Sequence, residues 1–261
     1  MKIVILGSGN VATHLAVALK ALGHEIQQVY SRTYENAVIL SKKVDAQPID
    51  KINQVVDTAD LYVFSVKDDA LRQVINAMPH TRGIWVHTAG SVPMDMFSSR
   101  AKEYGVLYPL QTFSKERNLS FKEIPLFIEA SSQSTFVAIE DLANSLSNQV
   151  HHLGSDKRSY LHLAAVFACN FTNHMYRLAG DIIQEEGVPF DVLKPLILET
   201  ASKVMEMSPA NAQTGPAVRY DEKVMQAHIN QLRSPQLKEL YTLLSKSIHS
   251  FASPSNTKTS E

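Results

Sequence analysis

The sequence has almost no cysteine and almost no excess charge. Cys169 is the single cysteine among 261 residues, so no disulfide can form within the chain, and we expect a reducing compartment. A net charge of -1 at pH 7 gives no basic surface for nucleic acid or an acidic membrane. No apolar run approaches the roughly 20 residues of a membrane span. The first apolar run follows Met1 directly, where a signal peptide would need more room. We therefore expect a cytoplasmic protein that binds neither nucleic acid nor membrane.

The first residues carry the clearest motif. Residues 3–6 form a short apolar run with β-branched side chains, as expected for a strand buried on both faces. The sequence GSGNVA follows from Gly7 to Ala12, and a helix-like stretch then runs to Leu22. This order of strand, G-x-G-x-x-A turn and helix is typical of a dinucleotide-binding site. The alternative is a tight turn that binds nothing.

Each small residue of this turn has an expected role in the fold or in cofactor binding. Gly7 allows the turn out of the strand, Gly9 leaves room for a pyrophosphate at the backbone, and Ala12 lets the helix pack closely on the sheet. The free N–H groups at the helix start favour the phosphate charge. A Gly at position 23 should end this helix with a left-handed cap. We expect the cofactor to contact Gly7, Ser8, Gly9, Asn10 and Val11.

The end of the second strand indicates which dinucleotide binds. Residues 25–30 read as that strand, and an NAD site usually has an acidic residue after it. Here Ser31, Arg32 and Thr33 follow instead. Arg32 can pair with a 2′-phosphate, to which the two hydroxyl groups can donate. The alternative is that Thr33 caps the next helix and Arg32 is only solvated. The residues favour NADP over NAD.

Two later strand ends should face the same cofactor. Strands are expected at residues 59–66 and 84–87, and ligands of open α/β sheets bind at the carboxyl ends of the strands. His87 would be a polar contact near the nicotinamide, or else a histidine satisfied by the backbone at a strand end. The residues expected at these two ends are Val66, Lys67, His87 and Thr88.

The alternation of strands and helices predicts an α/β fold with a doubly wound parallel Rossmann sheet over residues 1–153. Further strands are expected at 105–110, 125–130 and 150–153. From residue 154 no strand is expected, and the apolar residues fall at helical spacing. We therefore predict an all-α C-terminal domain at 154–252, for substrate binding and dimerisation. A polar, disordered tail is expected at 253–261.

Polar residues interrupt the first helix of the C-terminal domain, which we expect to run from Asp156 past Ala179. At 100° per residue, Asn173 returns to within about 20° of His162, and Asn170 lies about 80° from it. The helix is apolar elsewhere, so we expect it to be buried and its polar stripe to need partners. The substrate and a nicotinamide carboxamide are candidates. The alternative is a hydrogen-bond network between helices or at a dimer interface.

A polar, glycine-containing bend at residues 211–221 supplies two further candidates. Thr214 and Arg219 could reach an anionic substrate. Alternatively, Thr214 caps a helix and Arg219 pairs with Asp221. No metal site is predicted, and the candidate catalytic residues are His162, Asn170, Asn173, Thr214 and Arg219.

These motifs together resemble the 6-phosphogluconate-dehydrogenase-like superfamily, which includes pyrroline-5-carboxylate reductases and deazaflavin-dependent NADP oxidoreductases. More closely, the chain resembles a bacterial Rossmann-like family of NADP oxidoreductases whose helical C-terminal domain has no assigned function. The resemblance depends on GSGNVATHL, HTAGS, the helix from His162 to Asn173, YPLQTFS at 108–114 and QTGPAVRYD at 213–221. It implies NADP as cofactor and hydride transfer between NADP(H) and a small C=O, C=N or deazaflavin substrate.

One position departs from the resemblance. Many relatives have a lysine four residues before an asparagine on the first helix of the second domain. Here Lys157 is the last lysine of that helix, and Leu161 stands four residues after it. Two functions stay open. One is an oxidoreductase in which His162 replaces the lysine, and the other is a non-catalytic, NADP-binding regulatory or redox-sensing dimer. In both we expect a homodimer formed mainly by the helical domain.

Overall fold

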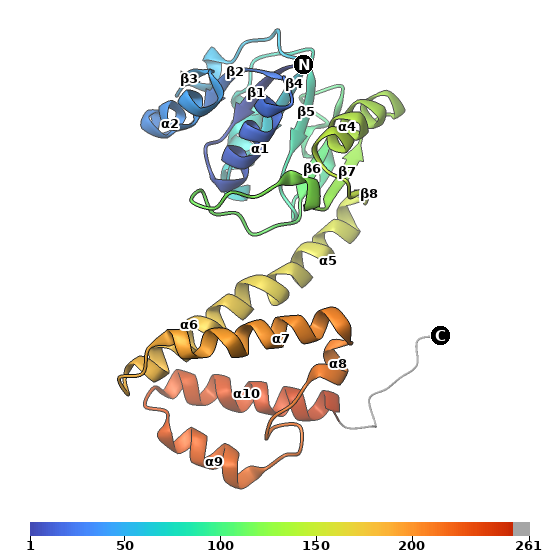
Figure 1. The fold of residues 1–261 in the computed structure, drawn as a ribbon. Helices are drawn as coiled ribbons and strands as arrows, with labels where there is room; N and C mark the ends of the chain where they lie inside the picture. Colours follow the sequence, from blue (N-terminus) through green and yellow to red (C-terminus); the bar gives the residue numbers. More distant parts are fainter. Residues whose placement is uncertain (253–261) are drawn as a thin grey trace. The chain divides into compact units, whose positions relative to one another are not determined.

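The computed structural model describes residues 1–252 (Figure 1). The chain divides into two compact units, Met1–Tyr176 and a second unit from Arg177 onward. The tail at 253–261, predicted to be disordered, lies outside the described residues. Among the described helices, none has the length and apolar character needed to span a membrane.

An eight-stranded sheet forms the centre of the first unit. Its strand order is β3-β2-β1-β4-β5-β6-β7-β8, and the first six strands in this order run parallel. The order 3-2-1-4-5-6 is that of the Rossmann fold, so the predicted fold class is confirmed. The strands are β1 Lys2–Leu6, β2 Glu25–Tyr30, β3 Gln47–Ile49, β4 Leu61–Phe64, β5 Ile84–His87, β6 Tyr104–Pro109, β7 Leu126–Ala130 and β8 Val150–His152.

Two details of the sheet differ from the prediction. β7 pairs with β6 in the antiparallel direction, with Leu107 opposite Ile128, so the sheet is mixed at this end. The segment between Pro109 and Leu126 contains a 3-10 turn, Phe121–Glu123, in place of a crossover helix, and antiparallel neighbours need no crossover. β3 was not predicted, because three residues that include Pro48 carry little strand pattern.

The two faces of the sheet bury two separate cores, and β1 contributes to both. Ile3 and Ile5 pack with apolar residues of three helices, α1 (Asn10–Ala21), α2 (Tyr34–Val44) and α4 (Gln133–Leu146). Val4 and Leu6 pack on the opposite face. That face is covered by α3 (Asp68–Ala77) and the 3-10 turn η2 (Met94–Phe97). Burial on both faces explains why β1 is apolar at every position after Lys2.

The first helix ends as predicted. Gly23 has a φ of 84°, in the left-handed region, and its N–H donates to the carbonyl of Lys20. The next N–H, of His24, donates back to Leu19. This pair of bonds satisfies carbonyl groups that the helix end would otherwise leave free.

The described residues after β8 form helices, as expected. α5 (Ser155–Ala165) continues through a π-helical segment (Val166–Phe171) into α6 (Thr172–Gln184). The predicted domain boundary at 153 coincides with the last strand, whereas the compact units divide at Tyr176, because side chains of α5 bond to the sheet. The second unit continues with η5 Phe190–Leu193, α7 Lys194–Glu206, α8 Pro209–Ala212, α9 Glu222–Gln231 and α10 Pro235–Ala252.

Candidate active site

The glycine turn after β1 is fixed by close backbone packing. Gly7 has a φ of 129°, and its N–H donates to the carbonyl of Tyr30 at 2.8 Å. A Cβ atom at this position would lie 2.1 Å from the carbonyl oxygen of Ser65, just after β4. The fold itself therefore requires glycine at position 7.

Gly9 is different, because the fold leaves space beside it. A Cβ atom built at Gly9 would have no atom within 4 Å, and the backbone there is extended. α1 begins at the next residue, so its first N–H groups border this space. A pyrophosphate group fits here, because the backbone, the helix N-terminus and the open volume coincide.

A cavity of about 510 Å³ lies beside this turn at the carboxyl ends of the strands. It brings together eight residues predicted to bind the cofactor: Gly7, Ser8, Gly9, Ser31, Arg32, Thr33, Val66 and Lys67. Other lining residues were not predicted, because no local motif marks them. They come from the end of β2, the start of α2, the 3-10 turn η1 (Ile52–Gln54), the residue after β4 and one face of α3. These are Tyr30, Asn36, Ile52, Ser65, Asp69, Ala70, Gln73, Val74 and Ala77.

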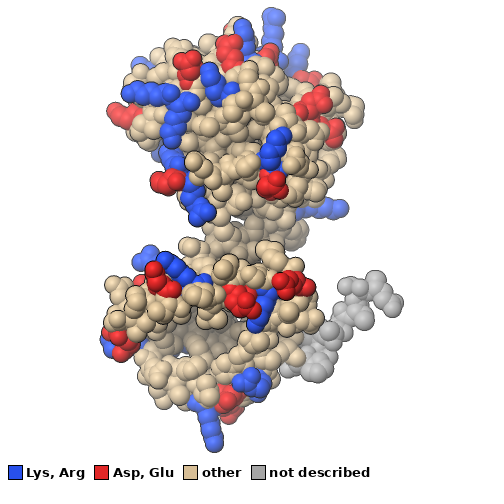
Figure 2. Space-filling view, in the orientation of Figure 1, with Lys and Arg blue, Asp and Glu red and all other residues tan. Residues whose placement is uncertain are grey.

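The polar groups after β2 lie as a phosphate site would need. The hydroxyl of Ser8 donates to Ser31 Oγ at 2.9 Å, which ties the glycine turn to the end of β2. Thr33 occupies the N-cap position of α2, but its side chain makes no capping bond. The Thr33 hydroxyl is therefore not used by the helix. Arg32 is exposed and has no ion-pair partner among residues 1–252. Figure 2 shows basic and acidic side chains interspersed over the visible face of this unit.

Asn10 and Val11 do not line the cavity. The side-chain amide of Asn10 donates to the carbonyl of Phe113 at 2.7 Å, and His14 Nε2 lies 2.9 Å from the carbonyl of Ser114. These bonds attach the loop after β6 to the start of α1. Val11 packs against the core. A cofactor contact of Asn10 would therefore come from its backbone N–H, since its side chain is engaged.

His87 is buried, which contradicts the predicted contact with the nicotinamide. The residue is 0% exposed, and its Nδ1 accepts from the N–H of Ala89 at 3.2 Å. Burial, and then the nearby positive charge of Arg158, lower the pKa of His87 to about 3. The backbone thus meets Nδ1 of this buried histidine, as the alternative for a strand end expected, and that bond leaves Nε2 unengaged. Thr88 is also largely buried, and its hydroxyl donates to Ser65 Oγ at 3.1 Å, at the rim of the cavity.

His162 of α5 lies against the ends of β5 and β6. Its Nδ1 is 3.0 Å from the hydroxyl of Tyr108, the fifth residue of β6. A Cβ atom at Gly90, in the loop after β5, would lie 2.6 Å from Cγ of His162, so the imidazole fills the space that a side chain would take. Burial raises the pKa of Tyr108, which keeps its phenol protonated. Tyr108 and Gly90 lay in motifs used for the resemblance, but nothing local marked them as neighbours of His162.

A buried ion pair holds α5 in this place. Arg158, one turn before His162, is 0% exposed and bonds to the carboxylate of Glu129 on β7. Its other terminal nitrogen donates to the carbonyl of Val92 at 2.5 Å. Ser155 donates to the same carboxylate at 2.8 Å and accepts from the N–H of Met94 at 3.0 Å. One network thus joins β7, the loop after β5 and the start of α5. None of these contacts was predicted, because the residues are far apart in the sequence.

The π-helical segment changes the predicted polar stripe. A π turn advances by roughly 80° per residue instead of 100°, so residues beyond it are rotated. Counted this way, Asn170 lies close to the direction of His162, and Asn173 is turned roughly 80° away. The predicted shared face of His162 and Asn173 is therefore wrong. Both asparagines are exposed in the single chain, so no other described segment of this chain buries them.

Thr214 and Arg219 belong to the second unit, and both are exposed. Asp221 accepts from the N–H of Val224 at 3.2 Å and so caps α9. The alternative was that Thr214 caps a helix and Arg219 pairs with Asp221. Within residues 1–252, Thr214 caps no helix and Arg219 forms no ion pair with Asp221. Tyr220, which stands between Arg219 and Asp221 in the sequence, has a φ of 51°, and its ring lies against His249.

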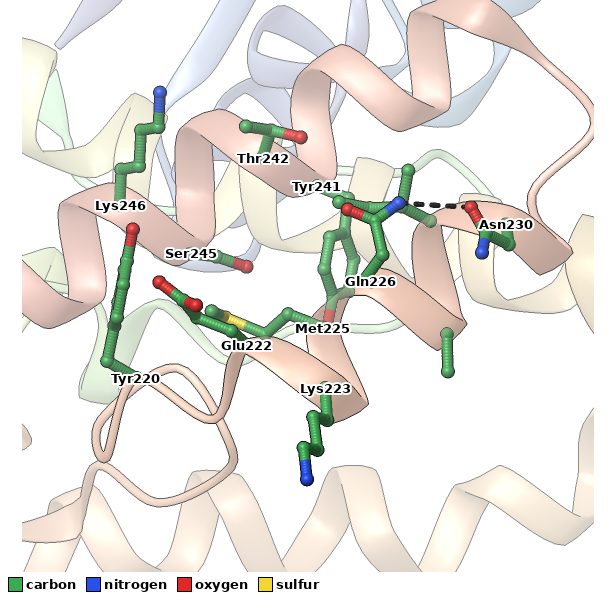
Figure 3. Close-up of a pocket in the computed structure, with 12 residues that line it drawn as sticks. Tyr220, Glu222, Lys223, Met225, Gln226, Asn230, Tyr241, Thr242, Ser245 and Lys246 are labelled. Atoms are coloured by element: carbon green, nitrogen blue, oxygen red, sulfur yellow. Dashed lines mark hydrogen bonds between the residues drawn. The ribbon is translucent and has the colours of Figure 1, made fainter.

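A second cavity, of about 670 Å³, lies between α9 and α10 (Figure 3). Tyr220 stands at one end of it, and Ser245 of α10 and Glu222 of α9 both line it. Gln226 donates to the side chain of Asn230 at 3.0 Å at the other end. Its lining consists of side chains, without the glycine-rich backbone of the first cavity. No residue of this cavity was predicted as a site.

Comparison with known proteins agrees with this geometry. Residues 2–86 match the family "NADP oxidoreductase coenzyme F420-dependent", and residues 124–248 match a domain of unknown function, DUF2520. The crystal structure of the putative NADP oxidoreductase BF3122 from Bacteroides fragilis is 48% identical, with 95% of this chain and 98% of that chain covered and a TM-score of 0.90. The search of curated proteins gave no match.

Two more distant structures share the fold. Protein TM1727 from Thermotoga maritima is 19% identical, with a TM-score of 0.78 over 96% of this chain and 99% of that one. A reductive aminase from Aspergillus terreus, in complex with NADPH and ethyl-5-oxohexanoate, is 18% identical, with a TM-score of 0.71 over 95% of this chain and 94% of that one. The fold and the glycine turn define a Rossmann-type dinucleotide-binding protein. Within that class, the chain belongs to the NADP oxidoreductase family of the Bacteroides fragilis protein.

The low pKa of His87 predicts a loss of stability in acid. Its unfolded-state pKa is about 6.5, and its folded-state pKa is about 3. Between these values the unfolded chain binds more protons, so the contribution is complete above pH 6.5 and is lost as the pH falls toward 3. In this range the titration of His87 should lower the free energy of unfolding by about 1.4 kcal/mol for each pH unit of acidification.

Urea unfolding of the parent and of His87→Phe at pH 7, 6, 5 and 4 measures this effect. Carboxylates titrate alike in both proteins, so the difference between the two curves isolates His87. The variant should lose less stability in acid than the parent. Parallel curves would show that His87 titrates normally in the folded state.

Proposed function

We propose that this chain reduces a small C=O or C=N compound, or a deazaflavin, with NADPH. The observation that carries the proposal is the position of His162 at the carboxyl edge of the same sheet whose glycine turn borders the cavity. In open α/β sheets this edge is where ligands bind. The similarity to the Bacteroides fragilis NADP oxidoreductase supports NADP as the cofactor. The similarity to the reductive aminase is a similarity of fold.

The residues of the cavity fit the parts of NADP. The backbone at Gly7 and Gly9 and the start of α1 would hold the pyrophosphate. Arg32, with the hydroxyls of Ser31 and Thr33, would hold the 2′-phosphate, because a guanidinium offers paired donors to a phosphate. The bound cofactor supplies the hydride, and the protein supplies binding, orientation and a proton.

His162 is the proton donor in this proposal. Histidine is the side chain best suited to proton transfer near neutral pH, so its imidazole can take a proton from solvent and give it to the oxygen or nitrogen of the substrate. Asn170 would align the substrate from the same direction of the helix, and Asn173 would contribute less. Thr214 and Arg219 stay candidates for contacts with an anionic substrate.

A homodimer is part of the proposal, and exposed apolar side chains support it. Four of them repeat at helical spacing along α5 and the π-helical segment. Tyr160, Leu163, Phe167 and Phe171 are 75%, 53%, 62% and 48% exposed. Such a contiguous apolar row is typical of a protein–protein contact.

The choice of dinucleotide can be tested at Arg32. Arg32→Ala should weaken NADP binding by tenfold or more and leave NAD binding nearly unchanged, since a charge-assisted pair contributes about 1.5–3 kcal/mol. Isothermal titration with both dinucleotides measures this. Arg72→Ala serves as the control, because Arg72 is exposed on α3 and does not line the cavity. Equal losses for both dinucleotides would contradict the assignment.

The role of His162 can be tested by turnover. We would screen NADPH oxidation with 2-oxo acids, ketones plus amines, cyclic imines and a deazaflavin. His162→Gln should lower turnover of the best substrate by at least about a hundredfold and change NADPH affinity by only a few-fold. His80→Gln, at an exposed histidine, is the control. Normal turnover in a folded variant would move the proton donor elsewhere. If NADPH binds but the parent reduces nothing, the regulatory alternative is favoured.

The dimer can be tested by light scattering. The parent should be a dimer at micromolar concentration, and Phe167→Asp should shift it toward monomer, because a charge in a desolvated contact is unfavourable. Lys157→Glu, at an exposed position of the same helix outside this row, should leave the dimer intact. A monomeric parent would contradict the proposal.

A further inference from the structure

His162 is oriented by two residues from different strand ends, and both contact the same side of its ring. The hydroxyl of Tyr108 lies 3.0 Å from Nδ1. A Cβ atom at Gly90 would have Cγ, Nδ1 and Cβ of His162 as its nearest neighbours, at 2.6–2.8 Å. The base of the ring and Nδ1 are thus enclosed. Nε2 has no hydrogen-bond partner within residues 1–252.

We propose that Tyr108 and Gly90 are positioning residues of the reductase site, and that Tyr108 keeps the proton of the neutral His162 ring on Nδ1. This inference rests on the proposed role of His162 as proton donor. The Nδ1–H group donates to the phenol oxygen of Tyr108, and Nε2 is left as the nitrogen that gains and gives the catalytic proton.

The proton balance requires this arrangement. Nε2 takes up the solvent proton that the reduction consumes with each hydride, which makes the ring an imidazolium, and gives that proton to the substrate heteroatom. The ring that remains is neutral and carries its proton on Nδ1. A partner at Nδ1 that accepts a hydrogen bond therefore favours the form that the ring returns to after each turnover.

The chemistry of the partner suits this role. A phenol oxygen can accept one hydrogen bond while its own hydrogen turns to water or substrate. Tyr108 is 7% exposed and sits within β6, so its hydroxyl has little freedom to move away. Gly90 leaves the space that the ring occupies, because any side chain there would push the His162 ring away from Tyr108.

The neutral tautomer of His162 in the free protein tests the proposal without a substrate. Long-range proton–nitrogen NMR, at a pH where the ring is neutral, distinguishes Nδ1–H from Nε2–H. The parent should carry the proton mainly on Nδ1. Tyr108→Phe and Gly90→Ala should shift it toward Nε2–H, the form that predominates for histidine in water. Tyr104→Phe makes the same change at the start of β6, outside the contact with His162, and should have no effect.

Turnover supplies the second measurement, with the best substrate of the NADPH screen. Tyr108→Phe and Gly90→Ala should lower kcat about tenfold and leave the KM for NADPH within about twofold, as expected for loss of one orienting hydrogen bond. A parent ring protonated on Nε2 would overturn the proposal. So would variants with the kcat of the parent while His162→Gln is inactive. If His162→Gln is itself fully active, the proposed function fails instead.

Discussion

The buried ion pair between Arg158 and Glu129 is the interaction on which the candidate site depends. A guanidinium without solvent contact loses its hydration, and one carboxylate seldom offsets that loss in free energy. Its value here is geometric, because Arg158 also binds the carbonyl of Val92 and shares Ser155 with Glu129. One side chain therefore fixes the start of α5 against a strand and a loop. His162 follows one turn later on the same helix, so its position is set by this network.

Most of the fold could be predicted because its signals are local. β1, the glycine turn and α1 follow one another within twenty residues, and apolar runs marked β4, β5 and β6. The direction of β7 could not be predicted, because a strand read as an apolar run carries no sign of its partner's direction. The π-helical segment could not be predicted either, for a similar reason. It is one turn of changed backbone hydrogen bonding within a continuous helix, and no residue type specifies it.

In the candidate site, too, local signals were predictable and contacts between distant segments were not. The residues gathered around the cavity were predictable where a motif fixed their role, as at Gly9 or Arg32. Contacts between distant segments were not. Tyr108 and His162 are 54 residues apart, and Arg158 and Glu129 are 29 apart. His87 shows the opposite error, because a polar residue at a strand end looked available although packing against Phe97 and the neighbouring strands buries it completely.

The glycines of the site show how fold and function can require the same residue type for different reasons. Gly7 is required by the fold, since β4 closes on it and its φ is positive. Gly9 has free space and an ordinary backbone, so the protein alone would accept a side chain there. Gly90 is required by a side chain, the ring of His162. A glycine that the fold does not need, at the start of a helix, therefore points to a ligand more strongly than the motif in which it stands.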